Sequence, residues 1–158
     1  MINPSPRVTR RSVLVAAAAS LMPMDTLFAA DQAVITVHKD PTCGCCAGWV
    51  RHLQQAGFAT NVIETKDLDP VKQRLGVPDD LAACHTAEVS GYVVEGHVPA
   101  SAVKRLLAER PSATGLAVPG MPVGSPGMEG GEPEVYEVVL FGPNGWRPYM
   151  RFRGDRAL

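Results

Sequence analysis

The chain lacks an excess of charge of either sign. Its 158 residues include 15 Lys and Arg against 16 Asp and Glu, which gives a formal net charge of -1. Proteins that bind nucleic acid generally carry a clustered basic face, so DNA or RNA is not expected as a partner. The sequence also shows no Ser-His-Asp set, phosphate-binding loop or paired-carboxylate motif. Hydrolytic and nucleotide chemistry therefore have no support.

Long hydrophobic runs are missing as well. The apolar stretch 13–22 ends at Pro23, whereas a membrane-spanning helix needs about 20 apolar residues. The residues before it are basic and include Arg7, Arg10 and Arg11. This combination predicts a removable signal over residues 1–30, and its adjacent arginines resemble a twin-arginine signal. We expect a periplasmic protein with no stable membrane insertion after the signal is removed, which leaves 12 basic and 15 acidic residues and a net charge of -3.

Cysteine is scarce but not scattered. Four cysteines are too few for a disulfide scaffold, and three of them lie close together as Cys43, Cys45 and Cys46, with Cys84 as the fourth. The remaining domain, residues 31–158, is long enough to bury a core without covalent staples. The cysteines are therefore available for chemistry.

Helical and strand patterns alternate along this domain. Short β-branched or alternating runs predict strands at 33–38, 61–65, 92–94, 136–141 and 146–152. Apolar spacing and stop signals predict helices over the stripe 46–53, over 69–75 and around 103–107. This order favours an α/β sandwich with a mixed β-sheet and flanking helices.

One segment does not fit that pattern. Residues 111–133 hold 11 of the 29 Gly and Pro residues and show no periodicity, which predicts an irregular Gly/Pro-rich loop. Loops of this length in a compact domain are uncommon and often functional. A functional arm and a simple surface excursion both fit the sequence.

The cysteine cluster follows the first expected strand and begins the first expected helix. The positive end of a helix dipole lowers the pKa of a thiol and favours the thiolate, which is both a nucleophile and a metal ligand. Clustered thiolates suit Cu(I) or zinc. Two disulfides in an oxidising compartment, or a zinc site, are alternatives. A third alternative is thiol-disulfide exchange by Cys43 and Cys46, for which Cys45 would be superfluous.

Several motifs, in this order, resemble the CopG-type periplasmic copper-resistance family, formerly a family of unknown function. The resemblance covers about residues 39–139 and rests on 39–46 (KDPTCGCC), Trp49, His52, Leu53, 57–58 (GF), 76–78 (GVP), 84–87 (CHTA), 91–92 (GY), 95–100 (EGHVPA) and 115–122 (GLAVPGMP).

This resemblance implies a thioredoxin-like fold and a site that binds several copper ions. The family's clustered cysteines fall on Cys43, Cys45 and Cys46, and its Cys-His pair falls on Cys84 and His85. It also implies a role in copper resistance, with Cu(I) held by thiolates and interconversion of Cu(I) and Cu(II) as an oxidoreductase activity. Other periplasmic copper-handling proteins are the expected partners. A metal-free docking module that uses the Gly/Pro-rich loop is a further alternative.

Imidazole and thioether side chains supply secondary candidates. His85 and His97 are candidate ligands near the strand around Tyr92, and Met121 in the Gly/Pro-rich loop is a candidate soft ligand. Four further residues are assigned otherwise. His38 and His52 are weaker ligand candidates, with His52 expected on a solvated helix face; Met128 is expected to fill a gap, and Trp49 to pack in the core.

Overall fold

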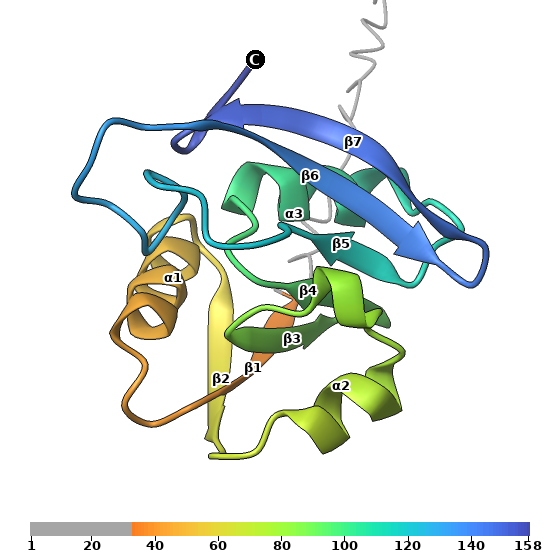
Figure 1. Ribbon diagram of the computed structural model, residues 1–158. Helices are drawn as coiled ribbons and strands as arrows, with labels where there is room; N and C mark the ends of the chain where they lie inside the picture. Colours follow the sequence, from red (N-terminus) through yellow and green to blue (C-terminus); the bar gives the residue numbers. More distant parts are fainter. Residues whose placement is uncertain (1–32) are drawn as a thin grey trace, which may run out of the picture.

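The structure, a computed structural model, describes residues 33–158 (Figure 1). The predicted signal, residues 1–30, lies outside the described residues. The helices are α1 (Gly44–Gln55), α2 (Asp69–Leu75) and α3 (Ala100–Glu109), with a 3-10 turn η1 (Asp79–Leu81). The strands are β1 (Val34–Lys39), β2 (Ala59–Glu64), β3 (His85–Val89), β4 (Tyr92–Glu95), β5 (Gly115–Ala117), β6 (Val135–Gly142), β7 (Gly145–Arg153) and β8 (Arg156–Ala157).

All of these strands form one open mixed sheet. Their order is β2-β1-β3-β4-β5-β6-β7-β8, in which β1 pairs in parallel with β2, β4 pairs in parallel with β5, and the other neighbours are antiparallel. The predicted α/β class with a mixed sheet and flanking helices is confirmed. The thioredoxin-like character of that sheet stays a prediction.

The two faces of the sheet bury different sets of side chains. Val94 packs in the larger core with residues of α1 and α3. Its neighbour Val93 points to the opposite face and packs with Val77 and Leu81, which lie beyond α2 and in η1. Successive residues of a strand face opposite sides of the sheet, so both faces are covered here by apolar groups. In Figure 1, α1 and α2 accordingly lie apart from one another, on different sides of the central strands.

Most predicted elements are present with shifted ends. The stripe of α1 is buried as predicted, with Trp49 and Leu53 both fully buried. Residues 69–75 form α2, and Gly76 ends it in a left-handed conformation with φ 68°. The sequence did not reveal β3, η1, β5 or β8. Because β5 lies inside residues 111–133, the prediction of an irregular segment is wrong at Gly115–Ala117, where β5 pairs with both β4 and β6.

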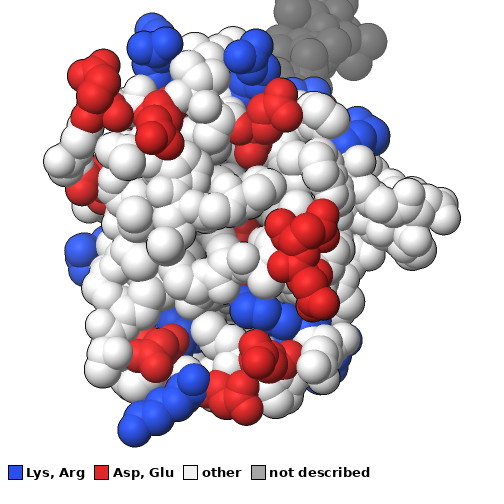
Figure 2. Space-filling model, viewed as in Figure 1, with Lys and Arg blue, Asp and Glu red and all other residues white. Residues whose placement is uncertain are grey.

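The surface shows no segregation of charge on the face that Figure 2 draws. Lys and Arg side chains lie among Asp and Glu side chains there, over both the β6–β7 end and the α2 end of the molecule. Within residues 33–158, no helix is both long enough and apolar enough to cross a membrane.

Candidate metal centre

The first turn of α1 presents three cysteines because Cys43 caps the helix. Cys43 has extended backbone angles, φ -72° and ψ 102°, and its Sγ accepts the Cys46 backbone N–H at 3.3 Å. The Asp40 carboxylate accepts the Thr42 backbone N–H at 2.7 Å, and the Asp40 carbonyl accepts the Cys43 N–H at 3.1 Å. These bonds fix the turn between β1 and α1, and therefore where the thiols begin.

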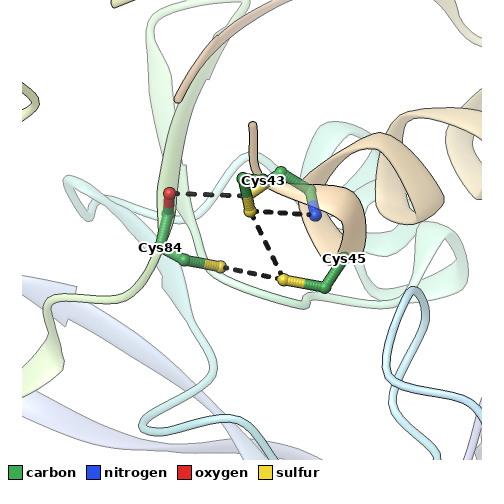
Figure 3. A group of neighbouring side chains, drawn as sticks. Cys43, Cys45 and Cys84 are labelled. Atoms are coloured by element: carbon green, nitrogen blue, oxygen red, sulfur yellow. Dashed lines mark hydrogen bonds between the residues drawn. A yellow bond between two sulfur atoms is a disulfide. The ribbon is translucent and has the colours of Figure 1, made fainter. Parts of the chain in front are cut away.

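The fourth cysteine, Cys84, is distant in the sequence but lies beside this turn in the structure. Cys45 Sγ lies 3.4 Å from Cys43 Sγ and 3.8 Å from Cys84 Sγ. Figure 3 shows the sulfur atoms of Cys43 and Cys84 both directed toward Cys45. Cys46 is fully buried, and its Sγ lies 3.5 Å from the Cys84 carbonyl oxygen. All four cysteines thus offer ligand atoms within 4.8 Å of one another.

Two of the four sulfurs are joined. Cys43 and Cys46 form a disulfide, whereas Cys45 and Cys84 are free thiols and half-buried. The two cysteines are only three positions apart in the sequence, so the bond constrains the unfolded chain very little. A role in chemistry accounts for this disulfide better than a role in stability.

Cys84 also belongs to a second group of candidate ligands. Its Sγ lies 3.4 Å from His85 Nδ1 and 3.3 Å from His97 Nε2, and the three ligand atoms lie within 4.8 Å of one another. Both histidines are fully buried. A soft sulfur beside two imidazoles suits copper in either oxidation state, or zinc.

The His85 ring lies against Trp49, and the His97 ring lies against that of His85. The His85 ring centroid is 4.4 Å from that of Trp49 and 5.0 Å from that of His97. Trp49 Nε1 donates to the Val98 carbonyl at 2.8 Å. Trp49 therefore packs in the core as predicted and also forms a wall of the site.

One polar atom at the site is buried without a hydrogen bond. Among the described residues, His85 Nε2 has no partner although the side chain is fully buried. Buried polar groups are normally satisfied, so each exception requires an explanation. The other ring nitrogen, Nδ1, faces the Cys84 sulfur, so Nδ1 is the candidate metal ligand and Nε2 would carry the proton of the neutral ring. An imidazole nitrogen beside a soft sulfur fits copper or zinc.

Burial governs protonation at the site. Burial is the main cause that raises the pKa of the Cys84 thiol to about 12, and the neighbouring Cys45 adds to it. Burial is also the main cause that lowers the pKa of His85 to about 3, and the neighbouring His97 adds to it. The helix dipole had been expected to favour thiolates in α1, but Cys84 lies outside that helix and stays protonated at neutral pH. His85 is neutral and available as a ligand.

Neither of these two groups contains His38 or His52. Met121 is 55% exposed. His38 Nε2 lies 3.2 Å from a Glu88 carboxylate oxygen rather than facing the cluster. His52 was expected on a solvated face, but its Nε2 accepts the Ala100 N–H at 3.0 Å. It therefore caps α3, whose N-cap residue Pro99 makes no side-chain cap.

The sequence did not reveal the buried ion pair beside Cys84. Glu95 is fully buried and accepts hydrogen bonds from Lys72 Nζ, from Thr86 Oγ1 at 2.7 Å and from the Ala83 backbone N–H at 2.6 Å. The last bond ties Glu95 to the residue that precedes Cys84. The sequence signal was the charged Glu95 at the end of an apolar strand.

Comparisons with known proteins agree with the cysteine motifs. The family model described as "Protein of unknown function, DUF411" matches residues 81–128. Two solved structures, Form 1 and Form 2 of "Copper resistance protein copG", are each 44% identical to this chain with a TM-score of 0.73. They cover 78% and 77% of this chain and 100% and 99% of their own. No curated protein sequence matches.

Proposed function

This chain belongs to the CopG family of copper resistance proteins, and we propose from that premise that it holds Cu(I) in a cluster of cysteine thiolates in the periplasm. The observation that carries the proposal is the convergence of the four cysteines within 4.8 Å. Thiolates select Cu(I), and a bridging sulfur is shared by neighbouring ions, so four cysteines hold more than one copper. The proposed ligands are Cys43, Cys45, Cys46, Cys84, His85 and His97. Met121, in the Gly/Pro-rich loop, is proposed as a further soft donor.

The disulfide adds a redox reaction to this proposal. When the thiols of Cys43 and Cys46 form their disulfide, two electrons and two protons leave the pair. Those electrons reduce two Cu(II) ions to two Cu(I) ions, and the protons pass to water. The reverse reaction consumes the disulfide, two protons and two Cu(I) ions and yields two Cu(II) ions. The chain itself thus contains the electron store that interconversion of copper requires.

An anaerobic titration tests both statements. Protein with the disulfide intact should show two reactive thiols under denaturing conditions, and fully reduced protein should show four. Competition against a Cu(I) chelator should give more than one copper per reduced chain and fewer per oxidised chain. The same protein with all thiols alkylated serves as the control and should retain none.

Thiol-disulfide exchange is the second candidate, because the Cys43–Cys46 bond also has the form of an exchange pair. Cys43 is half-buried and accessible to a partner, whereas Cys46 is fully buried. If the reduced protein fails to retain Cu(I) and instead reduces a disulfide substrate, this candidate replaces the first.

The proton on Cys84 predicts a pH dependence. Because its pKa lies near 12, the thiol must release a proton when Cu(I) binds throughout the neutral range. The apparent Cu(I) affinity should therefore rise roughly tenfold per pH unit for each proton displaced, from pH 6 to pH 8. His85, with a pKa near 3, stays neutral and does not oppose the metal. Chelator competition at several pH values measures this slope, and an affinity independent of pH would contradict it.

A further inference from the structure

We propose that the segment between β5 and β6 (118–134), here called the β5–β6 segment, fixes the tautomer of His97 and directs its Nε2 atom toward the metal site. The inference rests on the proposed copper function and assigns this segment a positioning role. It acts through the carbonyl of Pro126 and through the contact of Gly127 with α1. In Figure 1 this segment, cyan to blue, runs beside α1 before it enters β6.

His97 is held in one tautomer by a backbone carbonyl. Its Nδ1 lies 2.8 Å from the Pro126 carbonyl oxygen. A carbonyl oxygen only accepts hydrogen bonds, so Nδ1 of the neutral ring carries the hydrogen and Nε2 carries the lone pair. Nε2 is the atom that lies 3.3 Å from Cys84 Sγ. The Pro126 carbonyl therefore presents the ligating nitrogen to the cluster, as outer partners of metal-binding histidines do.

Hydrogen bonds within the turn hold Pro126 in place. The turn around it is bonded internally, since Ser125 N–H donates to the Pro122 carbonyl at 3.1 Å and Met128 N–H to the Ser125 carbonyl at 2.7 Å. The Gly127 N–H donates to a Glu129 carboxylate oxygen at 2.8 Å. Ser125 is fully buried. The Pro126 carbonyl thus belongs to an ordered turn.

This turn makes a close contact with α1. Gly127 has φ +89°, and a Cβ atom on it would lie 2.4 Å from the Cys45 carbonyl oxygen and 2.8 Å from the Trp49 nitrogen. A Cβ atom on Gly48 would lie 2.9 Å from the Gly127 Cα. Two glycines facing each other allow the two backbones to touch. The β5–β6 segment therefore contacts the helix that carries Cys45 and Cys46 and also the side chain of His97.

Substitution of Gly127 by alanine tests the role of this contact. The added methyl group must push the turn away from α1, so the Pro126 carbonyl should leave His97. Gly120→Ala is the matched control: Gly120 lies in the same segment with φ +72°, but a Cβ atom there meets nothing within 4 Å. Both variants carry the strain of an alanine at positive φ, and only Gly127→Ala breaks the contact.

Two measurements follow for each variant. In copper-free protein, ¹⁵N NMR should show His97 as the Nδ1–H tautomer in the wild type and in Gly120→Ala, and as a mixture of tautomers in Gly127→Ala. Competition against a chelator should show Cu(I) affinity lowered about 10- to 100-fold in Gly127→Ala, the usual effect of losing an outer partner of a metal ligand. Gly120→Ala should bind as the wild type does.

The NMR measurement separates this inference from the copper proposal, because it needs no metal. A wild type that binds no copper would defeat the proposed function, whereas unchanged His97 resonances in Gly127→Ala would overturn the inference. An altered tautomer with unchanged Cu(I) affinity would also overturn it. If Gly127→Ala does not fold, Glu129→Ala removes the acceptor of the Gly127 N–H without adding an atom. It should shift both readouts in the same direction by a smaller amount, and no shift would overturn the inference.

Discussion

Cys84→Ser is expected to weaken Cu(I) binding by more than about 100-fold. This loss exceeds the usual effect of removing a hydrogen-bond partner of a metal ligand, because the ligand itself is removed. Cys84 is the one residue shared by the two ligand groups, the four cysteines and the Cys84–His85–His97 set. A hydroxyl is a hard and poorly ionised donor, so serine cannot replace the thiolate toward a soft ion. Anaerobic competition with a Cu(I) chelator, on reduced protein, measures the loss.

Cys43→Ser is the matched control for that variant. It removes one thiolate from the cysteine group and abolishes the Cys43–Cys46 disulfide, but it leaves the Cys84–His85–His97 group complete. This variant should bind fewer copper ions per chain than the wild type but keep at least one Cu(I) site. Equal losses in the two variants, with both folded by circular dichroism, would contradict the special position assigned to Cys84.

Local patterns in the sequence predicted the half of the site that α1 carries. The apolar stripe with Trp49 and Leu53 marks a helix, and the cysteines precede or begin that stripe, so their place at its first turn followed from spacing alone. Cys43 as the N-cap needed the structure, because cysteine is not among the preferred capping residues. The resemblance to a known family supplied the pairing of Cys84 with the cluster.

The other half depends on contacts between distant residues, which local patterns do not contain. β3 was missed because His85, Thr86 and Glu88 make it look polar. The Thr86 and Glu88 side chains are satisfied by partners on β4 and α2. β5 is only three residues long and lies in a Gly-rich segment, so its pairing with β4 and β6 defines it. His97 reaches Cys84 because β3 and β4 pair antiparallel and bring their outer ends together.

Loss of the buried partner at Glu95 is expected to destabilise the protein strongly. Glu95→Leu leaves the Lys72 ammonium buried without its carboxylate and removes the acceptor of Thr86 Oγ1 and the Ala83 N–H. Breaking a buried ion pair from one side typically costs about 3–5 kcal/mol of unfolding free energy. Urea denaturation followed by circular dichroism measures the change. Glu109→Gln, which breaks the exposed pair of Arg105 and Glu109, serves as the control and should leave the urea midpoint nearly unchanged.

A double variant separates two contributions to the free energy of unfolding: the loss caused by an unpaired buried charge and the stabilisation that the ion pair itself provides. Lys72→Met alone should also destabilise, because burial raises the pKa of Glu95 and the carboxylate then loses the ammonium group that offsets this burial. Lys72→Met combined with Glu95→Leu removes both charges, and apolar replacements of a buried pair are often neutral or even stabilising. The double variant should therefore lose much less than the sum of the single variants, although the Ala83 N–H still lacks its acceptor. Additive losses would show that Lys72 and Glu95 act independently.

Since Ala83 adjoins Cys84, a stable double variant that binds Cu(I) less tightly than the wild type would assign Glu95 to the placement of that thiol as well as to the fold.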